Sequence, residues 1–294
     1  IDTLMEELKD KDKYLDKEVD ISVVEEDLEL FKEVYIRSRK IKNIFDSIAS
    51  KAGKFANVEK ELESKFSYIY DITDELSLIA LNSSVESYKL GSTGASFFVV
   101  SSEIKKDSER IGKLVVGLKN DIQELLKIVR SILLYTNISK LSIYMIIHFI
   151  DEILNDGDEG NLCDCEMILR DMVSVESNDI EITSKFITEL LTYLKKTNIY
   201  INDVENIIGE LHYIQLNGLV ESARLGEQKF SIIFNQVKEL VENTTNIINE
   251  IKPMIINTIK EAEDISNISE KIFKELRFMQ DLIKEDKQEI SVNS

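Results

Sequence analysis

The sequence is poor in the residues that interrupt helices. Its 294 residues include one proline, ten glycines and no tryptophan. Sheets and compact loops need many more proline and glycine residues at their turns. The scarcity of these residues therefore predicts very long helices and argues against a fold built on sheets.

Cysteine is also scarce. Cys163 and Cys165, separated by one aspartate, are the only two in the chain. A metal site would need two further ligands nearby, but the two histidines, His148 and His212, lie far apart in the sequence. We therefore expect a reduced, cytosolic protein with no metal and no other cofactor.

Basic residues are outnumbered by acidic ones. The chain has 36 Lys and Arg against 55 Asp and Glu, a net charge of -19, and no long basic run. Such a charge repels nucleic acid and anionic membrane surfaces. The expected partner is therefore another protein.

No apolar run is long enough to cross a bilayer. The most apolar window, residues 141–150, is about ten residues long and lies between Lys140 and Asp151, which is roughly half of a membrane span. We expect no membrane insertion of this chain and no signal peptide. The chain begins with Ile rather than Met, so the sequence leaves open that it is the cytoplasmic part of a longer protein with an upstream sensor or membrane segment.

What the sequence does contain is a long apolar heptad pattern. Hydrophobic residues make up 43% of the chain, enough for a continuous core. A seven-residue period kept over many turns is typical of helices that supercoil around one another. The four series are Ile41, Ile48, Phe55, Leu62, Ile69 and Leu76; Phe97, Ile104, Ile111, Leu118, Leu125 and Ile132; Ile180, Ile187, Leu194, Ile201 and Ile208; and Ile233, Leu240, Ile247 and Met254.

The few breakers divide the chain into two helical hairpins. Ser22 and Glu25 form a capping box, so we expect a short or frayed segment at 1–22 and a first long helix from about Val23. The first hairpin is predicted at 23–154 with its tip at 91–96, and the second at 162–294 with its tip at 226–229. A distal turn at 155–161 joins them. Pro253 should kink the last helix.

The predicted fold is all-α. Two tandem hairpins of matched length, joined by a short turn, would place both tips at the same end of a long antiparallel four-helix coiled-coil bundle. The two tips are also similar in sequence. IALNSSVESYKLG at 79–91 aligns with IQLNGLVESARLG at 214–226 at an offset of 135, and the residues after the turns align at an offset of 133. The chain therefore contains an internal repeat, and the turn of the second copy is expected to be shorter and to differ in shape.

Two further glycines occur at similar distances from the two tips. Gly112 precedes the middle of the second helix, and Gly209 lies in the third. They form one thin or flexible layer of the bundle, or they are glycines that a long helix tolerates. The sequence does not choose between these interpretations.

At the tips the sequence resembles a known family. The pattern, which covers about 25 residues without a gap in the first copy, is Ala80, Leu81, Asn82, Val85, Glu86, Gly91, Gly94, Phe97, Val99, Val100 and Glu103. It is similar to the hairpin tip of the cytoplasmic signalling domain of methyl-accepting chemotaxis receptors. The resemblance implies a hairpin that forms a four-helix bundle with a second subunit, binds a coupling protein and a histidine kinase, and clusters with other receptors.

Both hairpins lie on one chain here, so the resemblance implies a monomeric pseudo-dimer, a single-chain mimic of a receptor dimer, located in the cytoplasm or at receptor arrays. It also implies which residues contact partners. Contacts between neighbouring receptors correspond to Leu78, Leu81, Asn82, Val85, Glu86, Lys89 and Arg110, and in the second copy to Tyr213, Leu216, Asn217, Val220, Glu221, Arg224 and Asn243. The groove for the coupling protein corresponds to Asn82, Val99, Val100 and Glu103, and in the second copy to Ile232, Ile233 and Gln236.

The chain departs from the family at several of these positions. Lys89 stands where the family has an arginine and lacks its two-pronged carboxylate contact. Asn243 and Gln236 replace charged residues in the second copy. We therefore expect the first copy to bind the coupling protein better. Two structural alternatives stay open: Asn82 and Asn217 as buried residues that set helix register, and Glu86 and Glu221 as ordinary solvated carboxylates.

The leading hypothesis is a non-enzymatic signalling protein that modulates the kinase or the packing of receptor arrays. The alternative is a helical docking rod that has lost kinase control. We do not expect an enzyme, because the sequence has no nucleophile elbow and no phosphate-binding loop.

Overall fold

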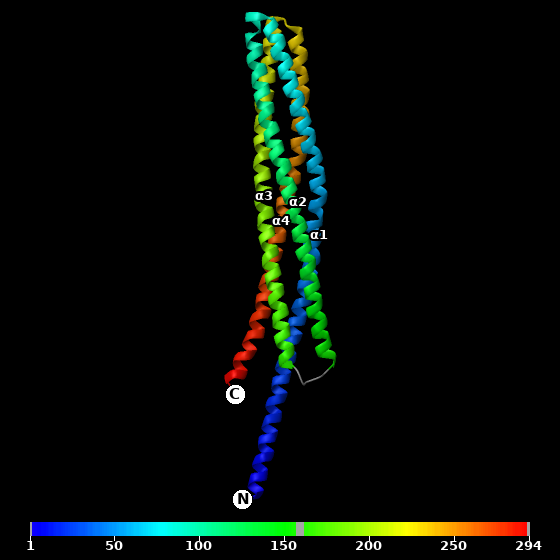
Figure 1. The fold of residues 1–294 in the computed structure, drawn as a ribbon, viewed down its shortest axis with the longest axis vertical. Helices are drawn as coiled ribbons and strands as arrows, with labels where there is room; N and C mark the ends of the chain where they lie inside the picture. The colour runs from blue at the N-terminus through cyan, green and yellow to red at the C-terminus, as the bar shows by residue number, and fades with distance from the viewer. Residues whose placement is uncertain (1, 157–161, 293–294) are drawn as a thin grey trace. The chain divides into compact units, whose positions relative to one another are not determined.

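The computed structural model describes residues 2–156 and 162–292, and the side chains of 29–55, 57–154 and 164–284. Four long helices pack against one another: α1 (Asp2–Lys89), α2 (Ala95–Asp156), α3 (Leu162–Leu225) and α4 (Gln228–Val292). A short 3₁₀ helix, η1 (Gly91–Gly94), lies between α1 and α2 (Figure 1). No strand occurs in the described ranges, so the all-α prediction is confirmed.

The helices form two compact units. Unit 1 consists of Ile1–Ser50, Ser131–Phe186 and Ile265–Ser294, and unit 2 of Lys51–Arg130 and Ile187–Asp264. Every helix contributes a segment to each unit. The unit boundaries therefore cut across the two sequence repeats instead of separating one hairpin from the other.

The heptad prediction is confirmed in the first three helices. All the side chains of the first three predicted series are buried, from Ile41 in α1 to Ile208 in α3. Burial of large aliphatic and aromatic side chains at seven-residue spacing is what holds long helices together, at roughly 25 cal/mol per Å² of apolar surface. A second buried row, three or four residues from the first, also contains hydroxyls, such as Thr73 in α1 and Thr197 in α3.

In α4 the predicted series is wrong. Ile233, Leu240, Ile247 and Met254 are only half-buried. The buried residues are instead Phe230, Phe234, Val237, Val241, Ile248, Ile251 and Ile255. The helix carries adjacent apolar pairs, such as Ile247 and Ile248, so two neighbouring stripes have the same period. Packing in the bundle buries the stripe that contains Ile248, and the predicted stripe with Ile247 lies beside it.

The predicted start of the first helix is also wrong. Helix α1 begins at Asp2 and runs through Ser22 without a break. Residues 1–22 contain neither glycine nor proline and are rich in Leu, Glu and Lys, which favour helix, so the capping box does not start a new one. Pro253 does not end the last helix, because α4 continues through it. Residues 157–161 of the expected distal turn lie outside the described ranges.

One helical stretch is long and apolar enough to cross a membrane, although the sequence predicted no such stretch. Among the described residues, a stretch within Gly91–Leu154 is long and apolar enough to cross a membrane, and 28% of it is buried. Helix α2 owes this to two apolar stripes near its end, one buried and including Ile143 and Ile146, the other exposed and including Leu141 and Met145. Core helices pass the same test, so this stretch alone is weak evidence for a membrane.

Candidate partner-binding surface at the two turns

The first turn depends on two glycines. Gly91 has a φ of +63°, in the left-handed region that glycine adopts without strain. At Gly94, a Cβ atom would lie 1.9 Å from the carbonyl oxygen of Ser87, so no other residue fits without moving the backbone. The Leu90 N–H donates to the Ser87 carbonyl at 3.2 Å. The two glycines thus set the direction in which the chain leaves α1.

The second turn is closed differently. Gly226 also has a positive φ, +73°. No 3₁₀ helix follows it; the Glu227 N–H donates to the Ser222 carbonyl at 3.0 Å, and the Ser222 hydroxyl donates to the Glu227 carbonyl at 2.7 Å. The two turns therefore differ in shape, as the shorter second copy predicts.

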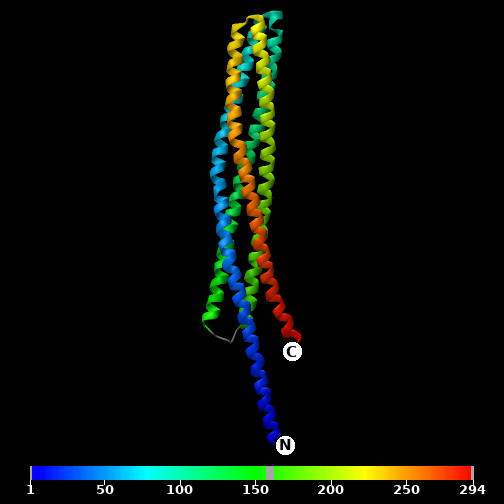
Figure 2. The same cartoon turned by 180° about the vertical axis from the view of Figure 1, so that it is seen from behind.

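An aromatic cluster joins the two copies directly beneath the turns. The rings of Phe97 and Phe230, which are equivalent positions of the repeat, stack with centroids 3.9 Å apart and planes 6° apart. Phe234 lies 6.1 Å from the first ring and 6.3 Å from the second. The two turns consequently lie side by side at one end of unit 2 (Figures 1 and 2).

Each turn has a partly buried glutamate that is contacted by the other copy. Glu221 accepts a hydrogen bond from the Ser96 hydroxyl at 2.7 Å, and Glu86 pairs with Lys229 at 3.5 Å. Ser96 and Lys229 are equivalent in the repeat, as are the two glutamates. The cross-contacts are therefore reciprocal.

Each glutamate is also held by a cation on its own helix. Arg224 donates to Glu221 through Nε at 2.8 Å and Nη2 at 2.6 Å, whereas Lys89 makes a single bond to Glu86 at 2.6 Å. The hydrogen bonds from Arg224 and then Ser96 lower the pKa of Glu221 to about 2, and the bond from Lys89 lowers the pKa of Glu86. Both groups are ionised at neutral pH, and neither is an ordinary solvated carboxylate.

Apolar side chains are exposed on the helix faces next to the turns. On α1 these are Leu78, Leu81 and Val85, and on α3 they are Tyr213, Leu216 and Val220. Their spacing of three and four residues places each trio on one helix face. Val99 on α2 and Ile232 on α4 are also exposed, at 60% and 63%. Exposed apolar residues gathered in one place are typical of interaction surfaces.

The polar positions of the predicted site are mostly exposed as well. Asn82 and Asn217 both face solvent, so the alternative in which they are buried and set helix register is wrong. Glu103 and Gln236 are exposed, and Val100 and Ile233 are half-buried.

Two exposed aromatic residues and the buried polar groups of the tip were not predicted from the sequence. Tyr88 is 86% exposed and Phe98 is 53% exposed, both in the first copy only. The buried polar pair is Ser83 and Ser101, whose hydroxyls are 2.6 Å apart. The FF doublet at 97–98 was a usable signal for Phe98, because adjacent helix residues point about 100° apart and Phe97 already occupies the core position.

The buried serine pair has a different counterpart in the second copy. The equivalents of Ser83 and Ser101 are Gly218 and Phe234, and a Cβ atom at Gly218 would lie 2.6 Å from the Phe234 ring. A pair of small residues in one copy thus corresponds to a glycine and a large ring in the other. The two tips fill the same place in the core in two ways.

Arg110 is occupied within the chain. Its Nη1 donates at 2.8 Å to Asp107 on α2 and at 2.8 Å to Glu210 on α3. The two acceptors raise its pKa. The equivalent residue in the second copy, Asn243, is half-buried and uncharged. The predicted contact role of Arg110 would require it to leave or share this ion pair.

All the predicted contact residues lie in unit 2, on segments that flank the two turns. Within the described part of the chain, no group of three or more His, Cys, Asp or Glu side chains is placed to hold a metal ion. Comparison of the chain with protein-family models, curated proteins and solved structures finds no match. The resemblance to chemoreceptors accordingly rests on the tip residues.

Proposed function

We propose that this chain is a chemotaxis-type signal transduction protein whose hairpin tips bind a coupling protein and a histidine kinase and modulate the kinase or the packing of receptor arrays. The observation that carries the proposal is the exposure of apolar side chains at the motif positions of both copies, including Leu81, Val85 and Val99. Exposure of such residues has a cost in water, which binding of a protein partner would remove.

We further propose that the four helices form two antiparallel hairpins that mimic a receptor dimer. Ion pairs in unit 2 support this arrangement, because Lys51 of α1 pairs with Glu261 of α4 and Lys65 pairs with Glu250, so the partner number falls as the α1 number rises. The stacking of the equivalent residues Phe97 and Phe230 supports a pseudo-twofold relation. A cytoplasmic location at receptor arrays follows from this proposal.

Reconstitution with purified coupling protein and kinase tests the function. We expect the chain to sediment with both proteins and to change kinase autophosphorylation. The Val99→Ser variant should bind the kinase complex about fivefold less, because the substitution removes an apolar contact worth roughly 1 kcal/mol. Ile256→Ser is the matched control, since Ile256 is 54% exposed on α4 away from the turns.

The possible outcomes separate the two functions. Binding without any change in autophosphorylation would favour the docking rod, for which the engagement of Arg110 by Asp107 and Glu210 is the supporting observation. Absence of binding at micromolar concentrations would contradict the proposal.

A further inference from the structure

Two surface grooves in unit 2 occupy equivalent places in the repeat. One lies between α3 and α4 and has a volume of about 410 Å³; the other lies between α1 and α2 and has a volume of about 400 Å³. The first is lined by Glu205, Ile208, Gly209, Val241, Glu242 and Thr245, among others. The second is lined by their repeat equivalents Tyr70, Thr73, Asp74, Ser108, Glu109 and Gly112, among others. Every residue of the second groove has its repeat equivalent in the first.

A glycine opens each groove, but from opposite walls. In the α1–α2 groove it is Gly112, whose equivalent is Thr245; in the α3–α4 groove it is Gly209, whose equivalent is Asp74. A Cβ atom at Gly209 would meet nothing within 4 Å. The space at Gly209 therefore exists because glycine has no side chain, and the glycine is not needed for a close contact between helices.

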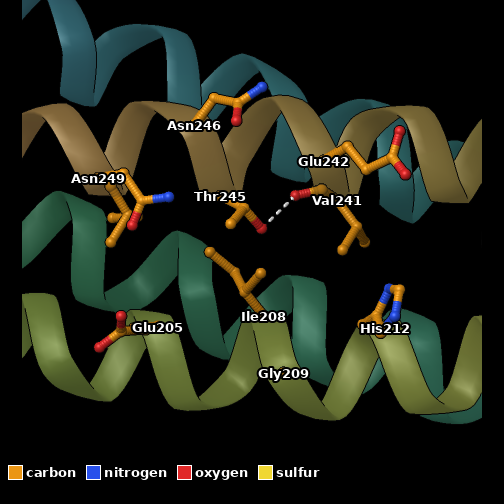
Figure 3. A pocket seen from close by; sticks show the side chains of 10 residues that line it. Glu205, Ile208, Gly209, His212, Val241, Glu242, Thr245, Asn246 and Asn249 are labelled. Carbon is orange, nitrogen blue, oxygen red and sulfur yellow. Dashed lines mark hydrogen bonds between the residues drawn. The ribbon is translucent and has the colours of Figure 1, made fainter.

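The floors of the two grooves differ in polarity. The α3–α4 groove has buried Ile208 and Val241 at its base, and Figure 3 shows both side chains in the space between the two helices. Their equivalents in the other groove are Thr73 and Ser108, whose hydroxyls donate to carbonyl oxygens of their own helices at 2.7 Å. Only the α3–α4 groove offers an apolar floor.

The rims differ in charge. Glu205 and Glu242 border the α3–α4 groove, and their side chains remain 45% and 57% exposed although they pair with Lys252 and Lys238. The α1–α2 groove also has two carboxylates, Asp74 and Glu109, but it has Lys113 where the other has Asn246. The α3–α4 groove therefore differs by the absence of this one lining cation.

We propose that the α3–α4 groove is a docking site for a protein segment that inserts one apolar side chain between flanking lysines or arginines, and that the α1–α2 groove is not. Ile208 and Val241 would contact the apolar side chain, and Glu205 and Glu242 would attract its basic neighbours. The α3 residues of the groove, 205–212, precede the exposed Tyr213, Leu216 and Val220 along the helix, so the site lies farther from the turns and uses none of the proposed kinase contacts.

Methyl NMR of the chain labelled at Ile and Val tests the proposal. The probe is a synthetic peptide with a central leucine between two lysine pairs, at moderate salt. We expect saturable shifts at Ile208, Val241 and Ile248 and little change at Val116 of the other groove. Replacing the leucine by serine, or the lysines by glutamates, should abolish the saturable shifts.

Gly209→Ala is the decisive variant, because it narrows the groove without a clash in the free protein. We expect binding to weaken about fivefold or more while the thermal midpoint does not fall. Gly53→Ala, also in a position with nothing within 4 Å but outside both grooves, should leave binding unchanged. Equal shifts in the two grooves, shifts spread over the whole acidic surface, or unaltered binding by the Gly209 variant would each overturn the proposal.

Discussion

Single glycines in this chain serve different purposes. Gly226 closes the second turn with a φ of +73°, whereas Gly53 lies inside α1, where an added Cβ would meet no atom within 4 Å. The Cβ atom of a residue in the left-handed region lies too close to the following carbonyl oxygen. In a helix interior, alanine instead has less conformational entropy to lose on folding than glycine has.

We therefore predict opposite effects of alanine at these two positions. Gly226→Ala should destabilise the chain by about 1 kcal/mol, and Gly53→Ala should stabilise it by up to about 1 kcal/mol. Urea unfolding followed by circular dichroism measures both. Equal effects of the two substitutions would show that the turn does not need the left-handed conformation.

Glu176 is a fully buried acid in unit 1. Neither of its carboxyl oxygens forms a hydrogen bond of normal length and angle. The nearby Ser139 and Ser142 hydroxyls act to lower its pKa, but their effect is smaller than that of burial. Burial is the main cause that raises its pKa to about 8, and the charge of Asp179 adds to the rise. The native state therefore keeps this proton at neutral pH while the unfolded chain, with an ordinary pKa of 4.5, releases it.

The sign of the pH effect follows from that difference. Between about pH 4.5 and 8 the native state binds more protons at this site than the unfolded state, so Glu176 lowers stability as pH rises. We predict that Glu176→Gln removes this loss, with a gain over the parent chain that grows to a few kcal/mol, on the order of 2–4, by pH 8. Urea midpoints at pH 5, 6.5 and 8 measure it. A gain that is the same at all three pH values would contradict the assignment.

At the scale of the helices, the two tips fill equivalent places in the core with different pairs of residues. Ser83 faces Ser101 between α1 and α2, and Gly218 faces Phe234 between α3 and α4. Exchange of one member without the other should either overfill or empty the space.

We predict that Ser101→Phe destabilises the first tip by about 1–3 kcal/mol and that the added change Ser83→Gly recovers most of the loss. The double variant reproduces in α1 and α2 the pair that α3 and α4 already contain. A double-mutant cycle by chemical unfolding measures the coupling. Additive effects would mean that the two residues do not share one site.

The buried residues of a helix could be predicted from the sequence where the helix has only one apolar stripe. Ile104 and Ile111 of α2 have no apolar rival stripe, and their burial follows from the period alone. In α4 the pair Ile247 and Ile248 offers two registers with the same period, and only contact with the other helices decides between them. The ion pair of Arg110 with Glu210 and the groove beside Gly209 were also beyond the sequence, because both depend on the relative heights of two helices.

At the scale of the whole molecule, the cross-contacts of the two copies occur within one chain. Phe97 stacks on Phe230, and Ser96 bonds to Glu221, without a second subunit. A homodimer that held such contacts between subunits would lose them on dilution.

We predict that the chain is a monomer of 33.8 kDa by light scattering and that its unfolding midpoint does not change over about a hundredfold range of protein concentration. An obligate dimer would have twice that mass, and its midpoint would rise with concentration. Either result would contradict the pseudo-dimer.

The pairing of Ser83 with Ser101 in one copy and Gly218 with Phe234 in the other has a consequence for how this protein can change over generations. In a dimer of identical subunits, each coding change appears at two places at once, and both must tolerate it. Here one nucleotide change alters one tip only. Such a chain can keep one tip as it is while the other acquires a new preference, a route of divergence that identical subunits do not have.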